Sequence, residues 1–123
     1  MGKPPSDRRR MIEAYGDGGF IIGGVRTSGS ILVFPRRTEA WTASEFNGIT
    51  LDSLAEVFSE APAIELLLVG CGIVQGLPPA ALRLGLSEAG VVADFMNTGA
   101  ACRTFNVLLA EDRRVAAALI AVE

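Results

Sequence analysis

The second half of the chain alternates between helix-like and strand-like segments, and this alternation constrains the fold more than any other feature. Residues 64–69 form a short apolar run bounded by Pro62 and Gly70, a pattern typical of a strand covered on both faces. Before it, apolar residues recur at helical spacing behind Thr50, which predicts an amphipathic helix that stops near Pro62. The predicted apolar face contains Leu51, Leu54, Ala55 and Phe58. Strands that alternate with helices form a parallel sheet with right-handed crossovers, so we expect an α/β fold.

Four further elements are predicted after this strand. Pro79 suits the first turn of a helix and Gly90 its C-terminal cap, while Asn97 or Thr98 can cap a second helix. The last segment fits either a strand or an alanine-rich helix, and the pattern leaves both open. The predicted ranges are a helix at 80–88, a buried strand at 91–95, a helix through 100–110 and the ambiguous segment at 115–122.

The first half is β-like and interrupted by glycines. Residues 20–22 and 31–34 are predicted strands joined by tight turns, and residues 36–49 form a connection or a short extra strand. No composition shift marks a second domain. We therefore expect one α/β domain at 11–123 with an N-terminal flank rich in β-hairpins, after a flexible basic tail at 1–10.

The composition excludes several classes of site. The 123 residues include no histidine, which removes Ser-His-Asp and Cys-His catalytic sets and histidine-ligated zinc. The two cysteines cannot form a four-thiolate metal site or a disulfide framework. We therefore expect no metal and no other cofactor.

Charge and hydropathy limit the partners. Residues 1–37 carry seven basic and three acidic groups, while residues 38–123 carry four basic and eleven acidic groups. Much of the basic excess lies in the tail, so nucleic-acid binding, which needs a larger basic face with stacking aromatics, is not expected. The longest uncharged apolar runs, 66–74 and 115–122, fall well short of the roughly 20 residues of a spanning helix. We expect no membrane span, and peripheral association stays open.

The candidate site lies where two strands end, because ligands of open α/β sheets gather beyond the carboxyl ends of the strands. Gly70, Gly72 and Gly76 are spaced one residue too far for a dinucleotide fingerprint and are more typical of a loop in which backbones pass closely. The candidate ligand or partner pocket comprises Gly70, Cys71, Gly72, Asp94, Thr98, Gly99, Ala100, Cys102 and Arg103.

Two readings of the thiols are open. Cys102, in the first turn of a helix beside Arg103, sits in a positive potential that favours the reactive thiolate. Alternatively it is a small buried apolar side chain, the commoner role of a free cysteine. Cys71 and Cys102 can form a redox pair only if their Cα atoms lie within about 7 Å.

The other polar candidates also have two roles each. Asp94 can act as a general base or cap nearby backbone amides. Arg103 can bind an anion together with the amides of Gly99 and Ala100, or pair with a carboxylate. Two aromatic residues of the irregular stretch, Trp41 and Phe46, can contact a partner or pack in the core.

Several of these segments carry a resemblance. Residues 15–20, 29–33, 65–70 and above all 97–111 resemble a family of small uncharacterised α/β domains whose mitochondrial member is assembly factor 3 of respiratory complex I. The resemblance implies a three-layer fold with a central mixed, mostly parallel sheet, and makes the last segment a strand. The mitochondrial relative is regarded as an assembly factor that works beside another one on the peripheral arm.

Two functions follow as expectations. The first is a non-enzymatic interaction domain that binds an assembly factor or a respiratory-complex subunit, placed in the bacterial cytoplasm, or in mitochondria if the role of the relative transfers. The alternative is a binder of a small anionic ligand or a thiol-dependent enzyme that uses Cys71, Cys102 and Arg103. The sequence does not indicate the oligomeric state.

Overall fold

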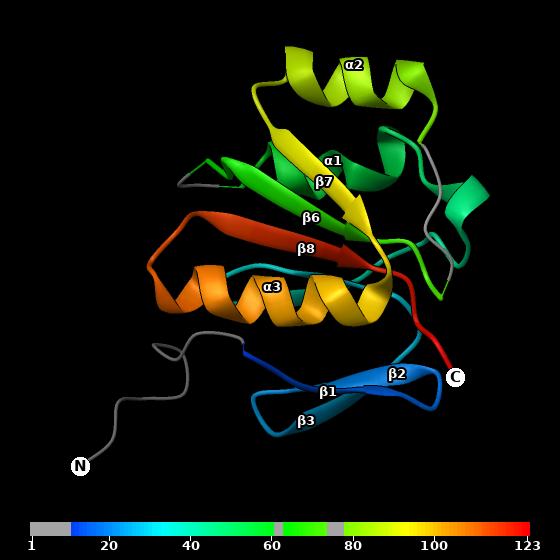
Figure 1. The fold of residues 1–123 in the computed structure, drawn as a ribbon, viewed down its shortest axis with the longest axis vertical. Coiled ribbons are helices and arrows are strands. Elements are labelled where there is room, and N and C mark those ends of the chain that lie inside the picture. The colour runs from blue at the N-terminus through cyan, green and yellow to red at the C-terminus, as the bar shows by residue number, and fades with distance from the viewer. Residues whose placement is uncertain (1–10, 61–62, 74–77) are drawn as a thin grey trace.

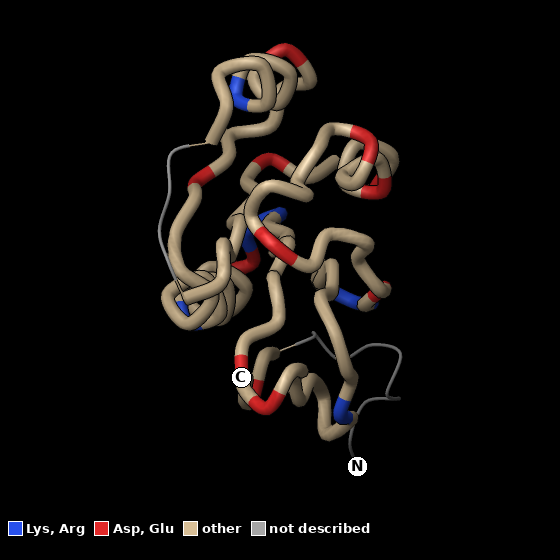
Figure 2. The backbone as a smooth tube through the Cα atoms, turned by 90° about the vertical axis from the view of Figure 1, so that its right-hand side faces the viewer, with Lys and Arg blue, Asp and Glu red and all other residues tan. Residues whose placement is uncertain are grey.

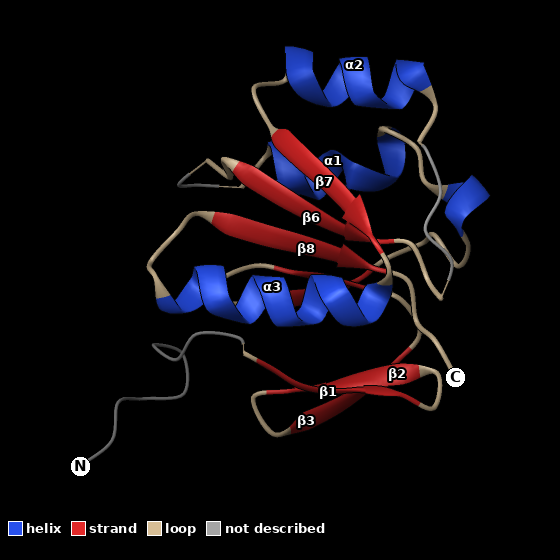
Figure 3. Cartoon of the chain, in the orientation of Figure 1, coloured by secondary structure: helices blue, strands red, loops and turns tan. Residues whose placement is uncertain are grey.

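The chain folds around two β-sheets (Figures 1 and 3). The computed structural model describes residues 11–60, 63–73 and 78–123. The central sheet contains, in spatial order, β5 (Thr38–Ala40), β4 (Ile31–Val33), β8 (Val115–Leu119), β6 (Leu66–Gly70) and β7 (Val92–Met96). The smaller sheet contains β1 (Ile12–Gly16), β2 (Gly19–Ile22) and β3 (Val25–Ser28). The helices are α1 (Ala55–Phe58), α2 (Ala80–Glu88) and α3 (Thr98–Ala110), with two short 3-10 turns, η2 (Phe46–Gly48) and η3 (Asp52–Leu54).

The central sheet is mixed. β6 pairs in parallel with β7 on one side and β8 on the other. β4 pairs antiparallel with β8, and β5 pairs antiparallel with β4, so β5 again runs in the direction of β8. The predicted parallel strands are confirmed. The last segment is the strand β8 in the middle of the sheet, which rules out the alanine-rich helix.

The sheet separates two apolar clusters and so gives a three-layer arrangement. Leu67 and Val69 of β6 face one cluster, which contains buried residues of α1 and α2. Leu68 faces the other, which contains α3 and the inner side of the small sheet, including Phe20 and Phe105. β6 is therefore covered on both faces, as its apolar run predicts.

Tight turns join the strands of the small sheet. Asp17 and Gly18 follow β1, and Gly23 and Gly24 follow β2, all with positive φ. Two consecutive residues with positive φ form the type I′ turn that matches the twist of a hairpin. The predicted β-rich flank is confirmed as a meander of three strands.

The helix that follows Thr50 is shorter than predicted, and it buries a different face. The Thr50 hydroxyl accepts a hydrogen bond from the backbone N–H of Ser53 at 3.1 Å, so the predicted cap is present. Beyond it lie only η3 and the four residues of α1. Leu54 and Val57 are buried, whereas Leu51 and Phe58, which the helical spacing assigned to the apolar face, are exposed. The predicted stop near Pro62 lies outside the described residues.

The strand predicted at 91–95 is not buried. It is observed as β7, at the end of the sheet order, and the Val92 side chain is 67% exposed. The helix 80–88 is observed with the predicted bounds, and Gly90 after it has a φ of 81°. The predicted basic tail, residues 1–10, lies outside the described residues.

Candidate functional site

The parallel strands β8, β6 and β7 end together at one edge of the central sheet. Gly70 is aligned with Met96 on one side and with Leu119 on the other. Two backbone hydrogen bonds continue the pairing beyond these residues, from Cys71 N–H to the Met96 carbonyl at 2.7 Å and from Ile120 N–H to the Gly70 carbonyl at 3.0 Å. The two strand ends that the sequence singles out are therefore neighbours.

Thr98 joins these strand ends. Its side chain is completely buried at the first residue of α3. The hydroxyl accepts a hydrogen bond from Gly72 N–H at 3.0 Å and donates one to the Ile120 carbonyl at 2.7 Å. The Thr98 N–H donates to the Gly72 carbonyl at 2.9 Å. Thr98 thus connects the residues that follow β6 and β8 by hydrogen bonds to Gly72 and Ile120, beyond the paired part of the two strands.

The close approach of α3 depends on Gly70. A Cβ atom at this position would lie 3.0 Å from the Thr98 Cα and 3.0 Å from the Leu119 Cδ2. Gly70 and Gly72 therefore serve the packing of their own chain, and the prediction of a loop in which backbones pass closely is confirmed at Gly70.

The predicted anion-binding groups are engaged by other side chains. The Asn97 side chain accepts from Ala100 N–H at 2.8 Å, which confirms the predicted helix cap. The Tyr15 hydroxyl lies so close to Gly99 that a Cβ atom there would be 2.4 Å from it, and it accepts a hydrogen bond from Arg103 Nη1 at 3.4 Å. An anion at this helix end would have to displace these contacts.

The two thiols lie in different parts of the core. Cys71 belongs to the cluster with α1 and α2, and Cys102 to the cluster with α3 and the small sheet. Both are buried, and burial raises the pKa of Cys71 and raises that of Cys102 to about 12. The positive charge of Arg103 lowers the Cys102 pKa, but burial outweighs it. This geometry favours the small buried apolar role for Cys102.

The remaining candidate residues do not belong to the strand ends themselves. Asp94 is exposed on the outer strand β7 and is aligned with Leu68, two residues before the strand ends. Trp41 is buried and its indole N–H donates to the Ser53 carbonyl at 2.9 Å, so it packs in the core. Phe46 is partly buried in η2.

An open apolar groove lies directly beyond the strand ends. We call it the strand-end groove; its volume is about 660 Å³. Ile73, which follows the β6 end, is 84% exposed. The lining is largely apolar and includes Cys71 and Gly72 from the predicted set. Its other described residues are Ser44, Glu45, Phe46, Asn47, Ile73, Ile120, Ala121, Val122 and Glu123.

Sequence reasoning missed most of this groove. Ile120 and Val122 follow β8, whose position beside β6 was not predicted. Ile73 carried a signal, because an apolar side chain in a glycine-rich loop after a buried strand has few places to pack. Phe46 was singled out as a possible partner contact, and it lines the groove.

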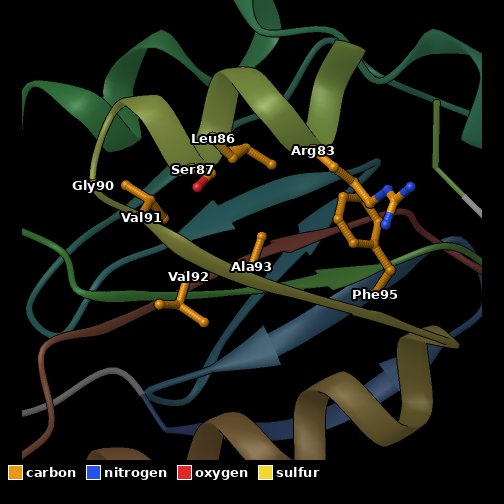
Figure 4. A pocket seen from close by; sticks show the side chains of 8 residues that line it. All are labelled: Arg83, Leu86, Ser87, Gly90, Val91, Val92, Ala93 and Phe95. Carbon is orange, nitrogen blue, oxygen red and sulfur yellow. The ribbon is translucent and has the colours of Figure 1, made fainter. Parts of the chain in front are cut away.

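A second hollow lies between α2 and the outer strand β7 (Figure 4). Its volume is about 410 Å³. Arg83 and Ser87 of α2 line it from above, and the Arg83 side chain points toward the ring of Phe95 on β7. It has one cationic side chain and shares no described lining residue with the strand-end groove.

The described residues form neither a metal-ligand cluster nor a membrane-spanning helix. Within 11–60, 63–73 and 78–123, no group of three or more Cys, Asp or Glu residues is arranged to hold a metal ion. In the same ranges, no helix has the length and apolar character needed to cross a membrane.

The chain matches, over residues 12–120, the family described as "Protein of unknown function (DUF498/DUF598)". It belongs to this family. A relative from Xenopus tropicalis, named NADH dehydrogenase (ubiquinone) 1 alpha subcomplex assembly factor 3, is 39% identical over 111 residues. The match covers 89% of this chain and 60% of that relative, so the chain spans well under two thirds of its length. An uncharacterised protein from Rhodobacter capsulatus is 38% identical over 109 residues, which cover 89% of this chain and 82% of the relative.

Solved structures share the fold. A protein from Bartonella henselae, described as an outer membrane protein, has a TM-score of 0.84 and 43% identity, with 94% of this chain and 98% of that chain covered. A Mth938-like domain from Bordetella pertussis has a TM-score of 0.81 and 30% identity, with 98% and 91% covered. The resemblance inferred from the sequence and the α/β fold are thus both confirmed.

Proposed function

We propose that this chain is a non-enzymatic protein-binding domain that assists assembly of the NADH dehydrogenase complex or of another membrane-associated complex. The observation that carries the proposal is the strand-end groove with the exposed Ile73 in its lining. An apolar side chain that is 84% exposed beside an apolar groove is a feature of interaction sites. The partner is an assembly factor or a subunit of the complex, as the names of the curated relatives suggest.

The polar groups of the predicted site support binding over catalysis. The Thr98 hydroxyl is committed to two backbone groups, and both thiols are buried with raised pKa values. Arg103 donates to the Tyr15 hydroxyl. A nucleophile and its base within hydrogen-bond reach would be the mark of a catalytic site, and these candidates do not form such a pair.

The setting is part of the proposal. Relatives from bacteria share the fold and most of the length of this chain, which supports a bacterial setting. There we place the chain in the cytoplasm, where it meets the complex at the membrane surface. We propose a mitochondrial location only if the role of the eukaryotic relatives transfers to this chain.

Photo-cross-linking from the groove tests this function. We expect p-benzoylphenylalanine at position 73, introduced in the native host, to cross-link to an NADH dehydrogenase subunit or another assembly factor identified by mass spectrometry. The same group at Ser87, in the hollow between α2 and β7, is the matched control, because it is also exposed but lies away from the strand ends. Equal cross-linking from both positions, or none from position 73, would contradict the proposal.

A further inference from the structure

The strand-end groove combines apolar and acidic side chains. Phe46, Ile73 and Ile120 form part of its apolar lining, and Glu45 and Glu123 are also among its lining residues. Among the described residues that line it there is no Lys or Arg. An occupant therefore meets an apolar surface and negative charge together.

Among the described residues, no cation pairs with the two carboxylates of the groove. Arg37 forms ion pairs with Glu39 and with Glu60, the latter at 2.7 Å, so the nearby acidic cluster has an internal cation. Within residues 11–60, 63–73 and 78–123, neither Glu45 nor Glu123 takes part in an ion pair. Their charge remains available to a partner.

The chain segment beside the groove is also acidic. Residues 38–60, which supply Glu45 and Phe46 to the groove, contain five acidic residues and no Lys or Arg. Three of the five, Glu39, Glu56 and Glu60, pair with Arg37, whereas Glu45 and Asp52 are in no ion pair among the described residues. Figure 2 views the molecule from the right-hand side of Figure 1, and acidic positions lie close in space to the C-terminus in this view. Charges of one sign around a cleft raise the local concentration of oppositely charged partners and their association rate.

From this juxtaposition we propose that the strand-end groove binds a segment of a partner protein in which exposed apolar residues are flanked by Lys or Arg. The apolar side chains cover Ile73 and Phe46, and the cations pair with Glu45 and Glu123. Apolar burial supplies affinity, while the charge pairs select the partner and its orientation. This inference rests on the proposed function, because it specifies the chemistry of the partner at the same groove.

Two synthetic peptides of equal length test the charge preference. Both carry Leu at helical spacing; the remaining positions are Lys-rich in one and Glu-rich in the other. Fluorescence anisotropy at low ionic strength is expected to show that the chain binds the Lys-rich peptide at least about tenfold more tightly. The double variant Glu45→Gln, Glu123→Gln and the single variant Ile73→Ser should each lose about tenfold in affinity for it.

Glu88→Gln is the matched control. Glu88 is an exposed acid at the end of α2 and does not line the groove, so its neutralisation should leave the affinity unchanged. Equal binding of the two peptides, failure of both to bind, or an equal loss in Glu88→Gln would overturn the inference. Cross-linking of position 73 to an assembly partner without a charge preference would refute only the partner chemistry. Absence of that cross-link would refute the proposed function whatever the peptides do.

Discussion

Replacement of Thr98 by valine is expected to lower the free energy of unfolding by about 2–5 kcal/mol. Valine has nearly the same shape as threonine but lacks the hydroxyl, so the Gly72 N–H and the Ile120 carbonyl each lose a partner at a buried position. An unsatisfied buried polar group costs about 1–3 kcal/mol, and two groups are affected here. Urea denaturation followed by circular dichroism measures the change, with the midpoint lowered at an unchanged slope.

Thr98→Ser is the control for this substitution. Serine keeps the hydroxyl and removes one methyl group, which costs roughly 1 kcal/mol for a buried carbon. If the valine variant proves as stable as the serine variant, the hydroxyl does not hold the strand ends together and this part of the account is wrong.

The second large effect is expected at Gly70. A valine there would place its Cβ 3.0 Å from the Thr98 Cα and its methyl groups against α3 or Leu119. Because one of these contacts is to backbone, relief requires α3 to move away from the sheet. Overpacking of this kind costs about 1–3 kcal/mol and occasionally more, so we expect a loss of roughly 3 kcal/mol in the free energy of unfolding.

Gly48→Val is the matched comparison. A Cβ atom at Gly48 would lie 3.9 Å from the Ala43 Cα, an ordinary contact, and the residue is exposed in η2. The expected loss is under about 1 kcal/mol. Equal melting temperatures for the two glycine variants would show that α3 can shift without cost.

Local signals account for the parts of the fold that were predicted well. Pro79 before and Gly90 after the segment give α2 its predicted bounds, and Asn97 caps α3 as its side-chain chemistry suggests. The apolar run that becomes β6 indicates burial on both faces, because Leu67 and Val69 belong to one cluster and Leu68 belongs to the other.

Strand order was beyond such signals. The segment at 91–95 is apolar apart from Asp94 and was predicted to be buried, yet β7 lies at the sheet edge with Val92 67% exposed. Burial of β7 would need a further strand on its outer side. The last strand of the chain, β8, pairs with β6 instead, so β7 stays at the edge. Pairings of this separation leave no trace in local periodicity.

The same reason limits prediction of the site. The sequence placed Thr98 in the candidate set but could not show that its hydroxyl binds groups 26 and 22 residues away. For Cys102 the sequence left two roles open, a reactive thiolate beside Arg103 and a small buried apolar side chain; packing beneath α3 buries the sulfur and raises its pKa to about 12, which favours the second. Burial by tertiary contacts decides both roles.

Complementation of a host strain that lacks this chain tests the central claim, that the strand-end groove serves assembly of the NADH dehydrogenase complex. Ile73→Glu places a charge at the groove, and Val25→Glu places the same charge on β3, at a side chain that is 63% exposed. Both variants should fold, because both side chains are exposed. We predict that Val25→Glu restores the amount of assembled complex on native gels and that Ile73→Glu does not. Full restoration by Ile73→Glu would contradict the account.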